Sequence, residues 1–144
     1  MTTTRELAIA GAALAVAGSS AMGAPVYYRT ATVEGVNMAY RESGSPDKPA
    51  LLLLHGVPSS SRMFDALMRR LGDSYHMVAP DYPGFGNSDV PDPVAFDYTF
   101  NHLSEVVEKF ADVVGLDRYV LFMQDYGAPV GMGVAQTGPT PYKA

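Results

Sequence analysis

An unbroken apolar segment near the middle of the chain restricts the fold more than any other feature. Residues 50–55 read ALLLLH, and Pro49 and Gly56 bound the segment. A strand with one face in water alternates apolar and polar residues, whereas a strand covered on both faces is apolar throughout. The segment therefore predicts a strand buried on both faces, which is typical of a parallel sheet.

The segments around this strand predict an α/β architecture. Residues 27–43 alternate, are rich in aromatic and β-branched side chains and contain one Glu-Gly turn, which favours a hairpin. Apolar side chains at helical spacing predict one helix that Ser60 or Ser61 caps and Gly72 ends, and a second over residues 103–114 that Gly115 ends. Short apolar runs predict strands over 76–80 and 118–124. The stripe expected to be buried on the second helix comprises Leu103, Val106, Val107, Phe110, Val113 and Val114. Strands that alternate with helices form βαβ units, so a largely parallel sheet should follow the leading hairpin.

The first residues have the layout of a secretory signal peptide. Arg5 precedes an apolar run over residues 7–18, and small residues follow it, so cleavage after Ala21 or Gly23 fits the small-residue rule. We expect residues 1–23 to direct export to the periplasm or out of the cell, with no stable membrane association after cleavage. An Ala-rich helix kept on a cytoplasmic protein is the alternative, because the run is too short to span a bilayer.

Composition restricts the domain count and the partners. The 144 residues are 47% hydrophobic and 17% charged, which suits one domain. We place it at residues 25–136, followed by an irregular tail at 137–144 whose two prolines end the last helix. The net charge of −5, with no Lys/Arg cluster, argues against nucleic acid or anionic lipid as a partner. The sequence has no cysteine, no His/Asp/Glu cluster at ligand spacing and no P-loop. We therefore expect that the protein uses neither a metal nor a cofactor.

Two glycine-containing motifs follow predicted strands, at the edge where open α/β sheets place their sites. In HGVPSSS, over residues 55–61, Gly56 lets the backbone turn off the strand and leaves the N–H of Val57 free to point into a cleft. DYPGFGNSD, over residues 81–89, contains successive turn residues. Taken alone, the first is also compatible with a capped strand-to-helix loop and the second with a surface loop.

A third motif, FMQDYGAPVG at residues 122–131, places Asp125 where a strand ends and a helix begins. Gly127 supplies a small residue two positions later, as in a strand-to-helix elbow that holds a nucleophile above the sheet. An aspartate that caps the following helix fits the same spacing.

The three motifs occur in an order that resembles a known family. LLLLHGVP, APDYPGFGNSD and FMQDYGAPVG are similar to motifs of α/β-hydrolases in the branch of haloalkane dehalogenases and epoxide hydrolases, over residues 27–134. The resemblance implies an α/β-hydrolase fold truncated after the nucleophile elbow, and a small, mostly apolar substrate. Asp125 would form a covalent ester, with the backbone N–H groups of Val57 and Tyr126 as the oxyanion hole. By resemblance, the supporting loop comprises His55, Gly56 and Pro58.

The chain also departs from this family. The histidine, orienting acid and helical cap of the family lie downstream of the elbow, and His55, His76 and His102 do not replace that histidine. We therefore expect that this chain alone does not turn over a substrate. The alternative to an incomplete enzyme is a non-catalytic remnant or binding module. Truncation should also expose an apolar strand edge near residues 119–123.

The substrate and partner chains stay open at this stage. Dehalogenases of this branch hold the halide with an indole N–H next to the nucleophile, where this chain has Tyr126, and often with an amide at the position of Val57. A generic hydrolase is therefore the preferred reading, and halide, epoxide and ester substrates remain alternatives.

Overall fold

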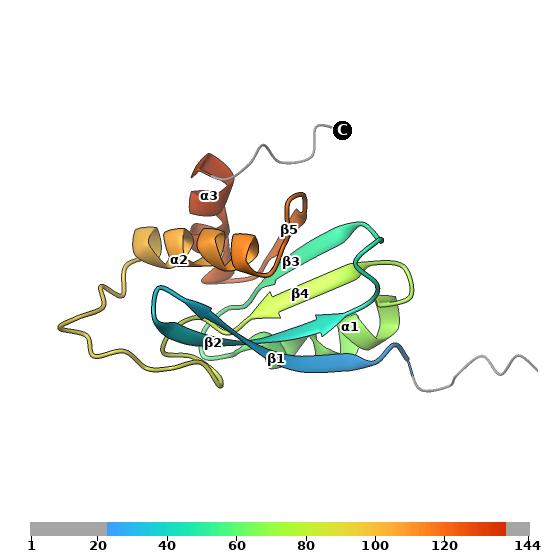
Figure 1. Cartoon of the computed structure of the whole chain (residues 1–144), viewed down its shortest axis with the longest axis horizontal. Coiled ribbons are helices and arrows are strands. Elements are labelled where there is room, and N and C mark those ends of the chain that lie inside the picture. The colour runs from blue at the N-terminus through green and yellow to red at the C-terminus, as the bar shows by residue number, and fades with distance from the viewer. Residues whose placement is uncertain (1–22, 138–144) are drawn as a thin grey trace, which may run out of the picture.

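The computed structural model describes residues 23–137 (Figure 1). The predicted signal peptide over residues 1–23 and the tail over 137–144 therefore lie almost entirely outside the described residues. The described elements, in chain order, are β1 (Val26–Val33), β2 (Val36–Ser43), β3 (Ala50–Leu54), η1 (Ser61–Phe64), α1 (Asp65–Leu71), β4 (His76–Pro80), α2 (Phe100–Val113), β5 (Val120–Met123) and α3 (Gly127–Thr137).

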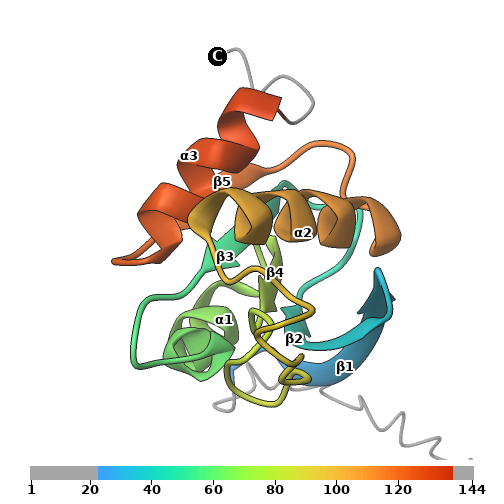
Figure 2. The same ribbon diagram turned by 90° about the vertical axis from the view of Figure 1, so that its left-hand side faces the viewer.

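The strands form one five-stranded mixed sheet in the order β1-β2-β4-β3-β5. The leading hairpin is confirmed, because β1 pairs antiparallel with β2, and β2 pairs antiparallel with β4. Parallel pairing of β3 with β4 and with β5 confirms the βαβ part of the prediction. Helix α1 covers one face of the sheet, and α2 and α3 cover the other (Figures 1 and 2).

The apolar run of β3 is buried on both faces, as predicted. Leu52 and Leu54 pack in the core cluster that contains the buried side chains of α2. Leu53, which points to the opposite face, packs with Phe64 and with Met68 of α1. All three leucines have no exposed surface, so β3 is the central support for both helical layers.

Two details of the helix predictions are wrong. The segment that follows Ser60 begins as the 3₁₀ helix η1, whose Arg62 N–H donates to the Ser60 Oγ, and the α-helix starts only at Asp65. Val113 is 57% exposed rather than buried. At about 100° per residue, it falls outside the arc of the helical wheel that the buried residues occupy, whereas Ala111 falls inside that arc and is buried.

Strand β5 forms an edge of the described sheet. It is shorter than the predicted strand and covers only residues 120–123. Val120 and Phe122 are each 47% exposed, so the edge carries apolar surface. Among the described residues, no helix has the length and apolar character required to cross a membrane.

Candidate active site

A sharp strand-to-helix turn holds Asp125 between β5 and α3. Its φ is 52°, in the left-handed region that residues other than glycine seldom adopt. The Gly127 N–H donates to the Gln124 carbonyl over 2.9 Å and closes the turn. A Cβ on Gly127 would lie 2.2 Å from the Leu54 carbonyl oxygen, so only glycine lets α3 begin this close to β3.

The carboxylate of Asp125 is held by two backbone donors. Its Oδ1 accepts from the Val57 N–H over 3.0 Å and from the Tyr126 N–H over 2.7 Å. These two hydrogen bonds lower the pKa of Asp125 below its ordinary value, and the bond from Val57 has the larger effect. Within residues 23–137, Oδ2 has no hydrogen-bond partner, and the side chain is exposed. One oxygen is therefore fixed, and the other is open to solvent.

The backbone of Gly56 lies directly against Asp125. A Cβ added to Gly56 would lie 2.4 Å from the Asp125 Cβ and 2.5 Å from the Gln124 Oε1, both shorter than any van der Waals contact. The Ser59 N–H donates to the Gly56 carbonyl over 3.1 Å, so Val57 and Pro58 form the centre of a tight turn. The structure thus brings the predicted supporting loop and Asp125 together.

His55 is fully buried beneath this loop. Its Nε2 accepts from the Tyr82 N–H over 3.4 Å, so the proton lies on Nδ1, which donates to the Gly56 carbonyl over 2.9 Å. The ring also stacks on Tyr82 at 4.1 Å. Burial lowers the pKa of His55, which keeps the ring neutral. Both nitrogens are used within the protein, so His55 supports the loop.

The other two histidines also bind groups away from Asp125. His76 Nε2 lies 2.8 Å from a carboxylate oxygen of Glu42, and His102 Nδ1 lies 2.8 Å from the Asp97 carbonyl. In the part of the chain that the structure describes, no histidine is bonded to Asp125.

Tyr126 contributes its backbone to the site and turns its ring towards α2. The ring packs edge-on against Phe100, with ring centroids 5.1 Å apart, and the residue is 45% exposed. Across residues 23–137, no group of three or more His, Cys, Asp or Glu side chains could hold a metal ion. The expectation that no metal or cofactor is needed stays a prediction.

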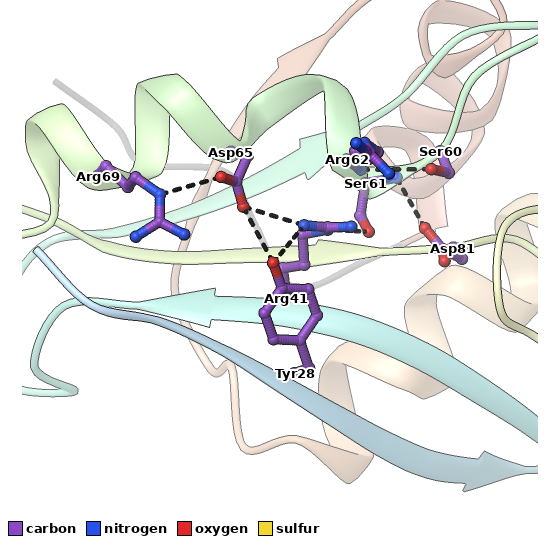
Figure 3. Close-up of polar contacts among 8 residues, drawn as sticks. All are labelled: Tyr28, Arg41, Ser60, Ser61, Arg62, Asp65, Arg69 and Asp81. Atoms are coloured by element: carbon purple, nitrogen blue, oxygen red, sulfur yellow. Dashed lines mark hydrogen bonds and ion pairs between the residues drawn. The ribbon is translucent and has the colours of Figure 1, made fainter.

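Sequence reasoning missed the buried polar residues behind the loop, shown in Figure 3. Asp81 is 2% exposed, and its two carboxylate oxygens accept from the N–H groups of Ser61 and Asn87 over 2.7 Å and 2.9 Å. Arg41 is 7% exposed and donates from Nε to the Ser61 Oγ over 3.1 Å. The position of Asp81, directly after a buried strand, was the one available signal for this cluster.

The sheet carries an exposed carboxylate on a strained turn, and two backbone N–H groups donate to one carboxylate oxygen. This arrangement is that of a hydrolase-type α/β scaffold. A family model described as alpha/beta hydrolase fold matches residues 49–144. The chain belongs to the α/β-hydrolase fold family, as the motifs predicted.

Curated relatives and solved structures agree with this assignment. The chain is 36% identical over 114 residues to the uncharacterized hydrolase YNR064C of Saccharomyces cerevisiae, which covers 79% of this chain and 39% of that protein. It is 41% identical over 87 residues to haloalkane dehalogenase 2 of Mycobacterium bovis, covering 60% and 30%. The crystal structure of haloalkane dehalogenase DbeA from Bradyrhizobium elkani superposes with a TM-score of 0.72 at 32% identity, covering 77% and 37%. The chain thus spans between 30% and 39% of these relatives.

Proposed function

We propose that this chain is part of a hydrolase in which Asp125 attacks a small, mostly apolar substrate and forms a covalent ester. The observation that carries the proposal is the asymmetry of the carboxylate. Oδ1 is bonded to two backbone N–H groups, and Oδ2 is free on an exposed turn. The carboxylate is the nucleophilic form, and the lowered pKa of Asp125 extends the pH range of that form below the ordinary carboxyl range.

In the first step, Oδ2 forms a bond to a saturated carbon of the substrate while that carbon loses its leaving group with the bonding electron pair. A halide departs as an anion, whereas an opened epoxide oxygen stays attached and takes up a proton from water. Asp125 becomes a neutral ester whose carbonyl oxygen is Oδ1, still facing the N–H groups of Val57 and Tyr126.

In the second step, water adds to Cγ of the ester, and negative charge develops on Oδ1. The N–H groups of Val57 and Tyr126 would then serve as the oxyanion hole. The Cγ–Oδ2 bond then breaks, and the product leaves as an alcohol that carries Oδ2 and takes up a proton, while the oxygen of the water stays on the Asp125 carboxylate. The attacking water must lose a proton to a base, and the three described histidines are bonded elsewhere. We therefore propose that the 144-residue polypeptide, tested by itself, stops at the ester.

The leaving group stays open in this proposal. Relatives named haloalkane dehalogenases favour a carbon–halogen bond. Tyr126 and Val57, however, present a phenol and an alkyl side chain where dehalogenases of this branch have halide-binding side chains, so an epoxide is tested together with a halide.

The test is the intact mass of the purified chain after incubation with a bromoalkane and with an alkyl epoxide. We expect a stable mass increase that maps to Asp125 and is absent in Asp125→Asn. Asp47→Asn is the matched control, because Asp47 is also exposed and its pKa is also lowered, by a hydrogen bond from Ser45, but it lies on no such turn.

The outcomes separate the alternatives. An adduct on Asp125 alone supports the nucleophile. Equal labelling of Asp47 and Asp125 would mean ordinary carboxylate reactivity, and a folded chain without an adduct would favour the binding module. Multiple turnover by this chain would refute the proposal that it stops at the ester.

A further inference from the structure

The loop that presents Val57 is anchored at its far end by Ser61. Ser61 is only 2% exposed. Its N–H donates to Asp81 Oδ1 over 2.7 Å, and its Oγ accepts from Arg41 Nε over 3.1 Å (Figure 3). Both hydrogen bonds are buried and involve charged partners, so they fix the residue more firmly than bonds that exchange with water.

Arg41 is itself held in place. Its Nη1 donates to Asp65 Oδ1 over 2.9 Å and to the Tyr28 hydroxyl over 3.0 Å. The guanidinium also lies 4.6 Å from the centre of the Tyr28 ring, and the planar group therefore has little freedom to rotate. Figure 3 shows these partners around Arg41, with Arg69 on the outer side of Asp65. The Nε that reaches Ser61 is thus part of a rigid anchor on β2.

Only a short segment connects Ser61 to the N–H group of Val57. Four residues lie between Gly56 and Ser61, and the hydrogen bond from the Ser59 N–H to the Gly56 carbonyl closes the first part into a turn. Pro58, at the centre of that turn, has a fixed φ. At the other end, Gly56 lies in close contact with Asp125. The segment between Ser61 and the Val57 N–H is therefore short and partly closed into a turn.

We propose that Arg41, through the hydroxyl of Ser61, positions the Val57 N–H for the carboxylate of Asp125. Arg41 is a positioning residue in this proposal, because its hydrogen bonds go to Ser61, Tyr28 and Asp65 and none reaches Asp125. The inference rests on the proposed function, since the position of Val57 matters most if Asp125 forms and loses an ester.

The test measures the coupling of Val57 to Asp125 without any reaction. In ¹⁵N-labelled protein, the amide resonance of Val57 should shift as Asp125 titrates, because the two groups share a hydrogen bond. We expect this shift to shrink, and the pKa of Asp125 to rise towards its ordinary range, in Arg41→Gln and in Ser61→Ala. Arg69→Gln is the matched control, because it removes the other guanidinium from the same Asp65. It should leave the coupling unchanged.

Ser61→Ala keeps the test decisive if Arg41→Gln fails to fold, because it deletes only the hydroxyl and keeps the N–H that binds Asp81. A folded Ser61→Ala chain with wild-type coupling would overturn the proposal and leave the anchoring to Asp81. Equal effects of Arg41→Gln and Arg69→Gln would overturn it too, since the effect would then be general stability. Failure of wild-type Asp125 to form any adduct refutes the proposed function, whereas this resonance experiment judges the positioning alone.

Discussion

A methyl group at Gly56 tests the geometry of the site most directly. In Gly56→Ala, the new Cβ would lie 2.4 Å from the Asp125 Cβ, 2.5 Å from the Gln124 Oε1 and 2.9 Å from the Asp125 Oδ1. The Gln124 side chain can rotate away. Asp125 cannot, because its Cβ is fixed by a backbone at φ 52°. Overpacking of this kind costs about 1–3 kcal/mol of folding free energy.

The clash should move the Gly56–Val57 backbone and Asp125 apart. Either Asp125 or the Gly56–Val57 backbone has to move by several tenths of an ångström, which lengthens the 3.0 Å bond from the Val57 N–H to Oδ1. The bond from the Val57 N–H lowers the pKa of Asp125 more than the bond from the Tyr126 N–H does. We therefore expect the pKa of Asp125 to rise towards its ordinary value in Gly56→Ala. The assays are urea denaturation for stability and carboxyl ¹³C resonances, followed against pH, for Asp125.

Gly35→Ala is the stability-matched control for this substitution. Gly35 has φ 83° and no atom within 4 Å of an added Cβ, so the left-handed backbone costs about 1–2 kcal/mol without any clash. Stability should fall in both variants, and the pKa of Asp125 should change only in Gly56→Ala. A folded Gly56→Ala chain with the wild-type pKa of Asp125 would show that the loop and the turn are not in the contact described here.

Three further predictions concern pH and processing. Because the pKa of Asp125 is lowered, its labelling rate should fall to half its maximum at a pH below the ordinary carboxyl pKa of 3.8, as mass spectrometry at successive pH values can check. Because the pKa of His55 is lowered in the folded protein, the unfolded chain binds a proton at this residue at a higher pH than the folded chain does. The contribution of His55 to stability should therefore be complete above pH 6.5 and fall as the pH drops below that value. Urea midpoints between about pH 7.5 and 5.5 should show this fall, and His55→Asn should reduce it. We also propose export with cleavage after Ala21 or Gly23, and N-terminal sequencing of the exported protein should then begin at Met22 or Ala24.

The sequence predicted the sheet better than the anchoring behind the site. The apolar run of β3 and the turn at Asp125 are local patterns, and each depends on neighbours in the chain. Arg41 lies in a strand that alternates, where a charged residue is normally exposed. It is buried because Asp65 and Tyr28, which are distant in sequence, supply its partners. No one-dimensional pattern contains that pairing, so the anchor could be found only from the fold.

In the mechanism that we propose, the two amide donors would affect the two chemical steps in opposite ways. When Asp125 attacks, charge leaves its carboxylate, so hydrogen bonds to Oδ1 stabilise the starting state more than the transition state. When water adds to the ester, charge returns to Oδ1, and the same bonds stabilise the transition state.

Donors at this position therefore favour a protein that hydrolyses its ester over one that only accepts an alkyl group. In a longer protein that carries the base, Gly56→Ala weakens the Val57 donor and should slow ester hydrolysis by up to about 10²–10³-fold, whereas ester formation should not slow. Rapid-quench mass spectrometry would then show the ester accumulating. An equal slowing of both steps would mean that Val57 acts through substrate placement, and the assignment of its N–H to an oxyanion hole would fail.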